Sequence, residues 1–167
     1  TVTLGTTCRT RETTTRTTEV AGPTQNGASQ HGQVVKPGPG WRGLGGANSY
    51  GGGPAVNGGT LLASNTTGSA TGTGPVTVNN LATLGGAGKV AEAVKIAPGG
   101  TLTPAAGHSR ESSFTTQATL TLASGSKLIF TPSDNTSTIR PGNIVHQGFH
   151  IQRATSTDQA TMPDLIN

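Results

Sequence analysis

Short aliphatic segments recur along this chain as one phrase: an aliphatic pair or triplet, a short turn, then a small residue before Leu. The phrase begins at Val56, Val76, Val94 and Leu120. Apolar and polar residues alternate within it, as in a strand that buries one face. Its spacing of roughly twenty residues falls in the range of solenoid repeats. The pattern therefore predicts strand-turn-strand units that stack on one another.

The same pattern gives the expected position of each strand. Strands are expected at 34–35 and 41–44, in the repeats over 56–62 and 76–104, in a strand pair over 118–132, and at 144–145 and 149–151. Asn57-Gly58 is a turn signal that would join two short strands. The polar stretches 63–75 and 105–117 are expected to form loops that point outward from the stack. Residues 87–96 could wind one helical turn, but their aliphatic residues suit a strand as well.

Three segments are expected along the chain. Residues 1–33 are rich in Thr with interspersed Arg and Glu, which predicts exposed edge strands or a flexible arm. Residues 34–132 hold the solenoid repeats, and residues 133–167 hold the last rung and a polar C-terminal tail. Cys8 is the single cysteine, so it forms no disulfide within the chain. It is expected to be a small strand residue or a free thiol, with an intermolecular bridge as the alternative.

Composition changes this picture in two ways. Only 31% of the residues are hydrophobic and 3% aromatic, while 26 are glycine. A thick core is therefore not expected, and one aliphatic layer per rung fits better. The net charge of +4 is carried by scattered Lys and Arg with almost no aromatics between them. Scattered charge without aromatics is not the pattern of a nucleic-acid-binding surface, so no nucleic-acid partner is expected. The expected fold is an all-β solenoid of stacked parallel rungs. No apolar run approaches membrane-spanning length, so membrane insertion is not expected either.

Several short strings match known catalytic or binding motifs, but the residues around them lack what those motifs require. Gly38-x-Gly40-x-x-Gly43 matches the dinucleotide fingerprint as a string, but no helix is expected after it. Gly88-Lys89 lacks the Ser or Thr of a phosphate loop. His146 and His150, if they share one strand, lie about 13 Å apart, too far for one metal ion. No catalytic, cofactor-binding or metal-binding residue is predicted, and the chain is not expected to be an enzyme. Its carboxylates, none of which recurs at the repeat spacing, are Glu12, Glu19, Glu92, Glu111, Asp134, Asp158 and Asp164.

Residues 36–61 hold a set of motifs in a characteristic order. They read Lys36-Pro37-Gly38-Pro39-Gly40, then Leu44-Gly45-Gly46-Ala47-Asn48-Ser49-Tyr50-Gly51-Gly52, then Val56-Asn57-Gly58-Gly59-Thr60-Leu61. This set resembles the autotransporter-associated β-strand repeat of large bacterial surface and secreted proteins, and similar motifs continue to about residue 130. Trp41-Arg42-Gly43 departs from the family, which has an aliphatic strand there. The resemblance implies a right-handed parallel β-helix, exported from the cell as passenger or surface-fibre material.

Three hypotheses about function follow. The first is a non-catalytic extracellular structural protein, a β-solenoid subunit of a bacterial surface fibre, filament or cell-surface layer. Its partners would be further copies of itself, bound through the solenoid ends or the N-terminal arm. The second is an adhesin that presents the loops at 63–75 and 105–117 to surface glycans. The third is a carbohydrate-active β-helix enzyme, which the scattered carboxylates disfavour.

Overall fold

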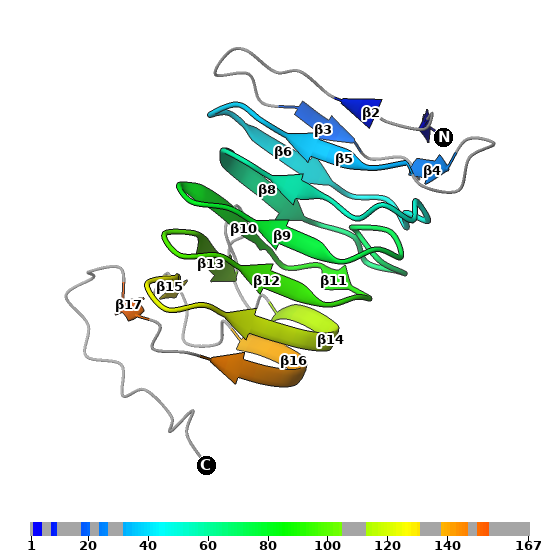
Figure 1. Cartoon of the computed structure of the whole chain (residues 1–167). Coiled ribbons are helices and arrows are strands. Elements are labelled where there is room, and N and C mark those ends of the chain that lie inside the picture. Colours follow the sequence, from blue (N-terminus) through cyan, green and yellow to red (C-terminus); the bar gives the residue numbers. More distant parts are fainter. Residues whose placement is uncertain are drawn as a thin grey trace.

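The strands of this protein stack as a parallel β-solenoid of about four turns (Figure 1). The computed structural model describes residues 32–104, 113–130 and 138–146, together with the backbone of short strands at 2–4, 8–9, 18–20, 24–26 and 150–153. All regular structure in these residues is β-strand. The fold class expected from the repeated phrase is therefore confirmed.

Two sheets run along the stack, and every described pairing within them is parallel. Sheet 1 contains β2 (Cys8–Arg9), β5 (Val34–Lys36), β7 (Ala55–Val56), β9 (Val76–Val78), β11 (Lys89–Val90), β12 (Val94–Ile96), β14 (Ser113–Leu122) and β16 (Thr138–His146). Sheet 2 contains β3 (Thr18–Val20), β6 (Trp41–Leu44), β8 (Gly59–Ala63), β10 (Ala82–Gly86), β13 (Thr101–Pro104), β15 (Lys127–Phe130) and β17 (His150–Arg153). A separate pair joins β1 (Val2–Leu4) to β4 (Thr24–Asn26).

Each turn contributes a strand to both sheets. A strand of sheet 1 leads through a short corner to a strand of sheet 2. The chain then returns to sheet 1, through 45–54 before β7 and 64–75 before β9, but through 87–88 alone before β11. Asn57-Gly58 forms one such corner, between β7 and β8. The two strands it joins lie in different sheets, so the expected turn is confirmed but it makes no antiparallel hairpin.

The irregular spacing of the repeated phrase has a simple structural origin. Val78 pairs with Ile96, 18 residues later, whereas Ile96 pairs with Leu122, 26 residues later. The strands keep their register in both cases, so the extra residues lie between Pro104 and Thr115, whose partners in the preceding turn are Gly86 and Lys89.

Backbone hydrogen bonds stack the corners in the same way as the strands. The amides of Asn57, Asn79, Ala97 and Ala123 donate to the carbonyls of Lys36, Val56, Val78 and Ile96, at 2.8, 2.9, 2.8 and 3.0 Å respectively. Each of these four amides thus bonds to the preceding turn at the same place in the fold. They form a matched series that reports on the contact between successive turns.

Three local expectations need correction or qualification. Residues 113–117 were expected in a loop but belong to β14, whose long edge pairs with both β11 and β12. Residues 87–96 form β11 and β12 rather than a helical turn. Residues 105–112 lie outside the described residues, so the rest of that expected loop is not placed.

The stretch 63–75 was expected to point outward, and its middle does not. Asn65, Ser69, Ala70 and Thr71 are buried. Two of these side chains serve the next turn: Asn65 accepts a hydrogen bond from the Lys89 N–H, and Ser69 accepts one from the Ala91 N–H. Only part of this stretch, including Thr66 and Thr67, faces solvent.

Candidate functional site: interior columns and the ends of the stack

Columns of register partners fill the interior of the solenoid. One column of sheet 1 runs Lys36, Val56, Val78, Ile96, Leu122 and His146. One column of sheet 2 runs Arg42, Leu61, Leu84, Leu102 and Leu128. The aliphatic members of both columns are buried in a single apolar cluster. Both columns therefore begin with a cationic side chain in the first fully described turn, and one of them ends on His146.

Lys36 is buried although the next four turns have Val, Val, Ile and Leu at its position. Only 1% of its surface is exposed. Its Nζ donates to the Gly38 carbonyl at 2.7 Å and reaches the Gly58 carbonyl at 3.5 Å, in the corners of its own and the next turn. A buried ammonium group requires such partners, because leaving water without them costs several kcal/mol. The corner carbonyls thus hold a charge inside the solenoid.

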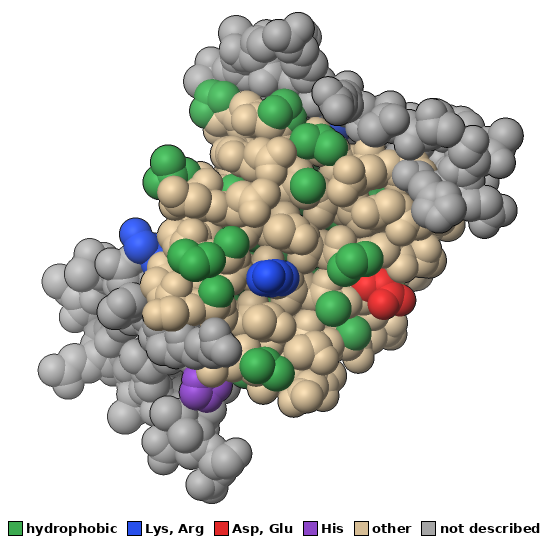
Figure 2. All heavy atoms as spheres, in the orientation of Figure 1, with side chains coloured by type: hydrophobic (Ala, Val, Ile, Leu, Met, Phe, Trp, Pro, Cys, Tyr) green, Lys and Arg blue, Asp and Glu red, His purple; other side chains and the backbone are tan. Residues whose placement is uncertain are grey.

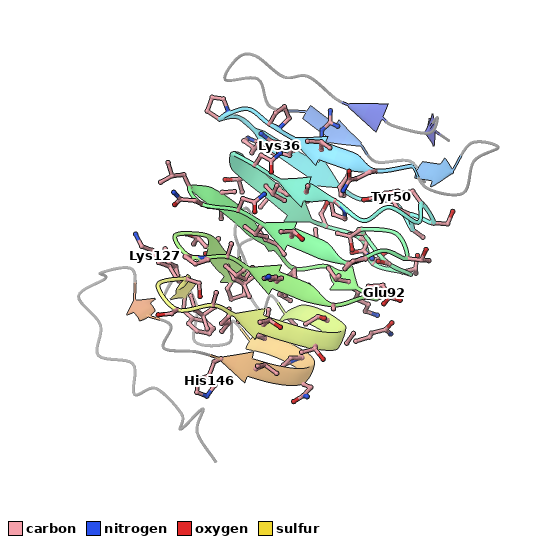
Figure 3. The ribbon with its side chains drawn as sticks, viewed as in Figure 1. Lys36, Tyr50, Glu92, Lys127 and His146 are labelled. Carbon is pink, nitrogen blue, oxygen red and sulfur yellow. The ribbon has the colours of Figure 1, made fainter. Side chains whose placement is uncertain are left out.

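Arg42 and Tyr50 place further polar groups in the same turn. Arg42 is 8% exposed, and Tyr50 is completely buried. Among the described residues, the Tyr50 hydroxyl has no hydrogen-bond partner. Burial raises the pKa of this phenol well above its ordinary value, and the nearby positive charge of Arg42 opposes the rise only in part. Lys36 and Tyr50 lie toward opposite sides of the solenoid, so the polar groups are spread across this turn (Figure 3).

The other end of the stack, at β16, exposes the apolar interior. Ile144 pairs in register with Leu120, which is fully buried. Ile144 itself is 39% exposed. β16 pairs with β14 along one edge, and none of the described strands pairs with its other edge. The last described turn of sheet 1 therefore offers both an unpaired strand edge and an uncovered interior column.

Asn65 joins its own loop to the next turn on the loop side of the solenoid. Its Nδ2 donates to the carbonyls of Thr67 and Gly68, at 3.1 and 2.9 Å. Its Oδ1 accepts from the backbone N–H of Lys89, at 2.8 Å, in the next turn. The Asn65-Thr66-Thr67 sequence has the form of a glycosylation acceptor, but this buried amide is already fully used within the fold.

The histidines considered for a metal site lie on different strands. His146 ends β16 in sheet 1, and His150 begins β17 in sheet 2. The shared strand considered in the distance argument is therefore not what the structure shows. Among the described residues, no three His, Cys, Asp or Glu side chains lie close enough together to hold a metal ion.

Few of the other candidate groups fall within the described side chains. Of the seven carboxylates only Glu92 does, in the loop between β11 and β12. Glu19 and Cys8 lie in β3 and β2, where only the backbone is described. The remaining carboxylates, Glu12, Glu111, Asp134, Asp158 and Asp164, lie outside the described residues.

The glycine strings that resemble nucleotide and phosphate loops belong to the solenoid itself. Gly38 and Gly40 lie in the corner between β5 and β6, and Gly43 lies in β6. Gly88-Lys89 leads directly into β11. No helix follows either string, and a helix is what the nucleotide and phosphate motifs require. On the face shown in Figure 2, charged side chains are scattered among uncharged ones.

The sequence did not reveal that Lys36 and Arg42 occupy interior positions. A signal was present, because Trp41-Arg42-Gly43 interrupts an otherwise aliphatic pattern. To place Lys36 and Arg42 inside from this signal, one must know which residues pair between strands. That register depends on the lengths of the corners.

Comparison with protein-family models, with curated proteins and with solved structures finds no significant match to this chain. In the part of the chain that the structure describes, no helix is both long and apolar enough to cross a membrane.

Proposed function

We propose that this protein is a non-catalytic structural protein, a β-solenoid that joins other copies of itself through its ends as part of a surface fibre, filament or layer. The observation that carries the proposal is the exposure of Ile144 at an interior position. A column that is fully buried at Leu120 is left uncovered one turn later. Another solenoid end would cover it and pair with the free edge of β16.

The stacking geometry favours this function over a compact binding module. Each turn of a solenoid contacts only the turns on either side, so the end of a stack presents the same kind of surface as any internal boundary. Two ends can therefore pair by the backbone and side-chain contacts that already join turns within the chain. Extracellular localisation and kinship to autotransporter-associated repeats remain proposals that rest on the sequence motifs alone.

Negative-stain electron microscopy of the purified chain across a concentration series tests this proposal. Rod-like oligomers or filaments with a width of one solenoid are expected as concentration rises. A change in filament formation after truncation of residues 1–30 would further support the proposal that copies join through the solenoid ends. Single particles at every concentration, unaffected by that truncation, would overturn the proposal.

A second candidate is an adhesin that binds glycans through its polar loops. Exposed Thr66, Thr67 and Thr73 in the stretch 63–75 are the observation in its favour. Because Asn65, Ser69 and Thr71 point inward, the available surface is narrower than the sequence suggested. Replacing Thr66, Thr67 and Thr73 by Ala leaves the buried side chains in place. Loss of binding to a glycan array in that variant would support adhesion, and binding unchanged from wild type would argue against it.

A further inference from the structure

The interior of the solenoid is divided at its first fully described turn. The main apolar cluster contains one residue from before β7, Leu44. The other buried apolar side chains of that turn, Val34 and Tyr50, form a separate cluster of their own. Lys36 and Arg42 occupy the two column positions at which an aliphatic side chain would join the clusters.

The apolar packing across the boundary between the first and second turns, where Leu44 alone continues into the main cluster, is therefore thinner than the packing at the later boundaries. Between later turns, Val56 pairs in register with Val78, and Leu61 pairs with Leu84. All four side chains are fully buried. Removing a fully buried Val or Leu from its surroundings costs about 1.5–3 kcal/mol. A buried cation gains much less, because its desolvation cancels most of its attraction to its partners.

A glycine-rich connection lies at this boundary. Gly51, Gly52, Gly53 and Pro54 link β6 and its following loop to β7, and Gly53 has a positive φ of 64°. Glycines of this kind absorb the dihedral changes of a hinge with little strain.

From these observations we infer that the turn of the solenoid that contains β5 and β6 opens as a unit from the turns after Gly53, while those turns stay folded. The cationic layer formed by Lys36 and Arg42 sets the place where it opens. Opening uncovers the edges of β7 and β8, with Val56 and Leu61 behind them. Local opening of this kind takes less free energy than global unfolding and is visible in hydrogen exchange.

The stacked corner amides allow a direct test by native-state hydrogen exchange, followed by NMR. Asn57 donates to Lys36 and Thr60 donates to Gly40, so both amides report on the boundary with the first turn. Asn79 and Ala97 report on the next two boundaries. After correction for intrinsic rates, Asn57 and Thr60 are expected to exchange about tenfold or more faster than Asn79 and Ala97. Their exchange should depend on denaturant less steeply than exchange through global unfolding does, since opening exposes only the surface between two turns.

Variants that complete the columns give the sharper comparison. Lys36→Met removes the charge at nearly constant side-chain length, and Arg42→Leu supplies the residue found at Leu61, Leu84, Leu102 and Leu128. The double variant should slow exchange at Asn57 and Thr60 by about tenfold and leave Ala97 unchanged. Lys95→Met is the matched control, because Lys95 is an exposed lysine on the outer side of sheet 1. It should change none of these rates.

Equal protection of Asn57, Asn79 and Ala97 in the wild-type protein would overturn the inference. So would a double variant that shifts all of them together, which would indicate a single cooperative unit. If the double variant does not fold, Arg42→Leu alone is measured, with the same expected direction. The experiment uses dilute monomer, so its outcome is independent of whether the chain assembles as proposed above.

Discussion

Leu81 and Gly99 occupy the same corner position in successive turns and share an unusual backbone conformation. The Leu81 N–H donates to the Gly99 carbonyl at 3.2 Å, and the two residues have positive φ angles of 60° and 74°. Glycine adopts this conformation readily, whereas a residue with a Cβ pays about 1–2 kcal/mol. The Leu81 side chain is 84% exposed and so recovers little of that cost by packing.

Leu81→Gly is therefore expected to stabilise the protein, by about 1 kcal/mol in chemical denaturation, after the higher chain entropy of glycine is subtracted. Gly125→Ala is the matched control, because Gly125 has a φ of 76° and an added Cβ would touch nothing within 4 Å. It should destabilise by about 1 kcal/mol through the backbone alone. A Leu81→Gly variant that loses as much stability as Gly125→Ala would contradict the strain assigned to Leu81.

Asn65 offers a test of the loop-side contacts between turns. Asn65→Asp keeps an oxygen to accept from the Lys89 N–H but loses both donors to the Thr67 and Gly68 carbonyls, and it buries a charge beside them. A loss of about 2–4 kcal/mol is expected in urea denaturation.

Asn57→Asp is the exposed counterpart of that change. Asn57 accepts one hydrogen bond, from Asn79 Nδ2 at 2.6 Å, and a carboxylate still accepts it. An effect below about 0.5 kcal/mol is expected. Similar losses of stability in Asn65→Asp and Asn57→Asp would show that the buried hydrogen bonds of Asn65 add no stability beyond that of an exposed Asn.

The burial of the Tyr50 phenol predicts that the free energy of unfolding falls at alkaline pH. Burial raises the pKa of this phenol in the folded protein above its value of about 10 in the unfolded chain. Above that pH the unfolded chain releases the proton while the folded protein keeps it, so the unfolded state binds fewer protons and stability falls. Below about pH 10 the contribution is complete, and it is lost progressively as pH rises further.

The measurement is direct because Tyr50 is the only tyrosine in the chain. Ultraviolet absorbance of tyrosinate should rise together with unfolding rather than before it. Tyr50→Phe should abolish the alkaline loss. At neutral pH it should leave stability unchanged or raise it slightly, because the hydroxyl it removes has no described partner. Ionisation of Tyr50 near pH 10 in the fully folded protein would show that the phenol is accessible.

Much of the architecture could be predicted because a solenoid repeats a local pattern. The alternation at Val76–Val78 and Val94–Ile96 correctly predicted buried faces, and the Gly and Asn residues correctly predicted corners. These signals depend on residues near one another in the chain. They therefore require no knowledge of what lies above or below each strand.

The features that the sequence did not predict depend on the stacking itself. Lys36 looked like a break after a strand, and only its pairing with Val56 places it inside. Asn65 and Ser69 looked like loop residues because small polar side chains usually face solvent. Here they are buried because the backbone groups of adjacent turns need hydrogen-bond partners.

The central claim is that copies of the chain join through the end of the described stack at β16. Sedimentation velocity over a wide concentration range, comparing the wild type with Ile144→Lys, tests it most directly. Leu81→Lys is the matched control, since it adds the same charge at an exposed Leu far from that end. The account predicts concentration-dependent oligomers for the wild type and Leu81→Lys, and a shift to monomer for Ile144→Lys with its fold intact. Equal association of all three proteins, or a wild type that stays monomeric throughout, would contradict it.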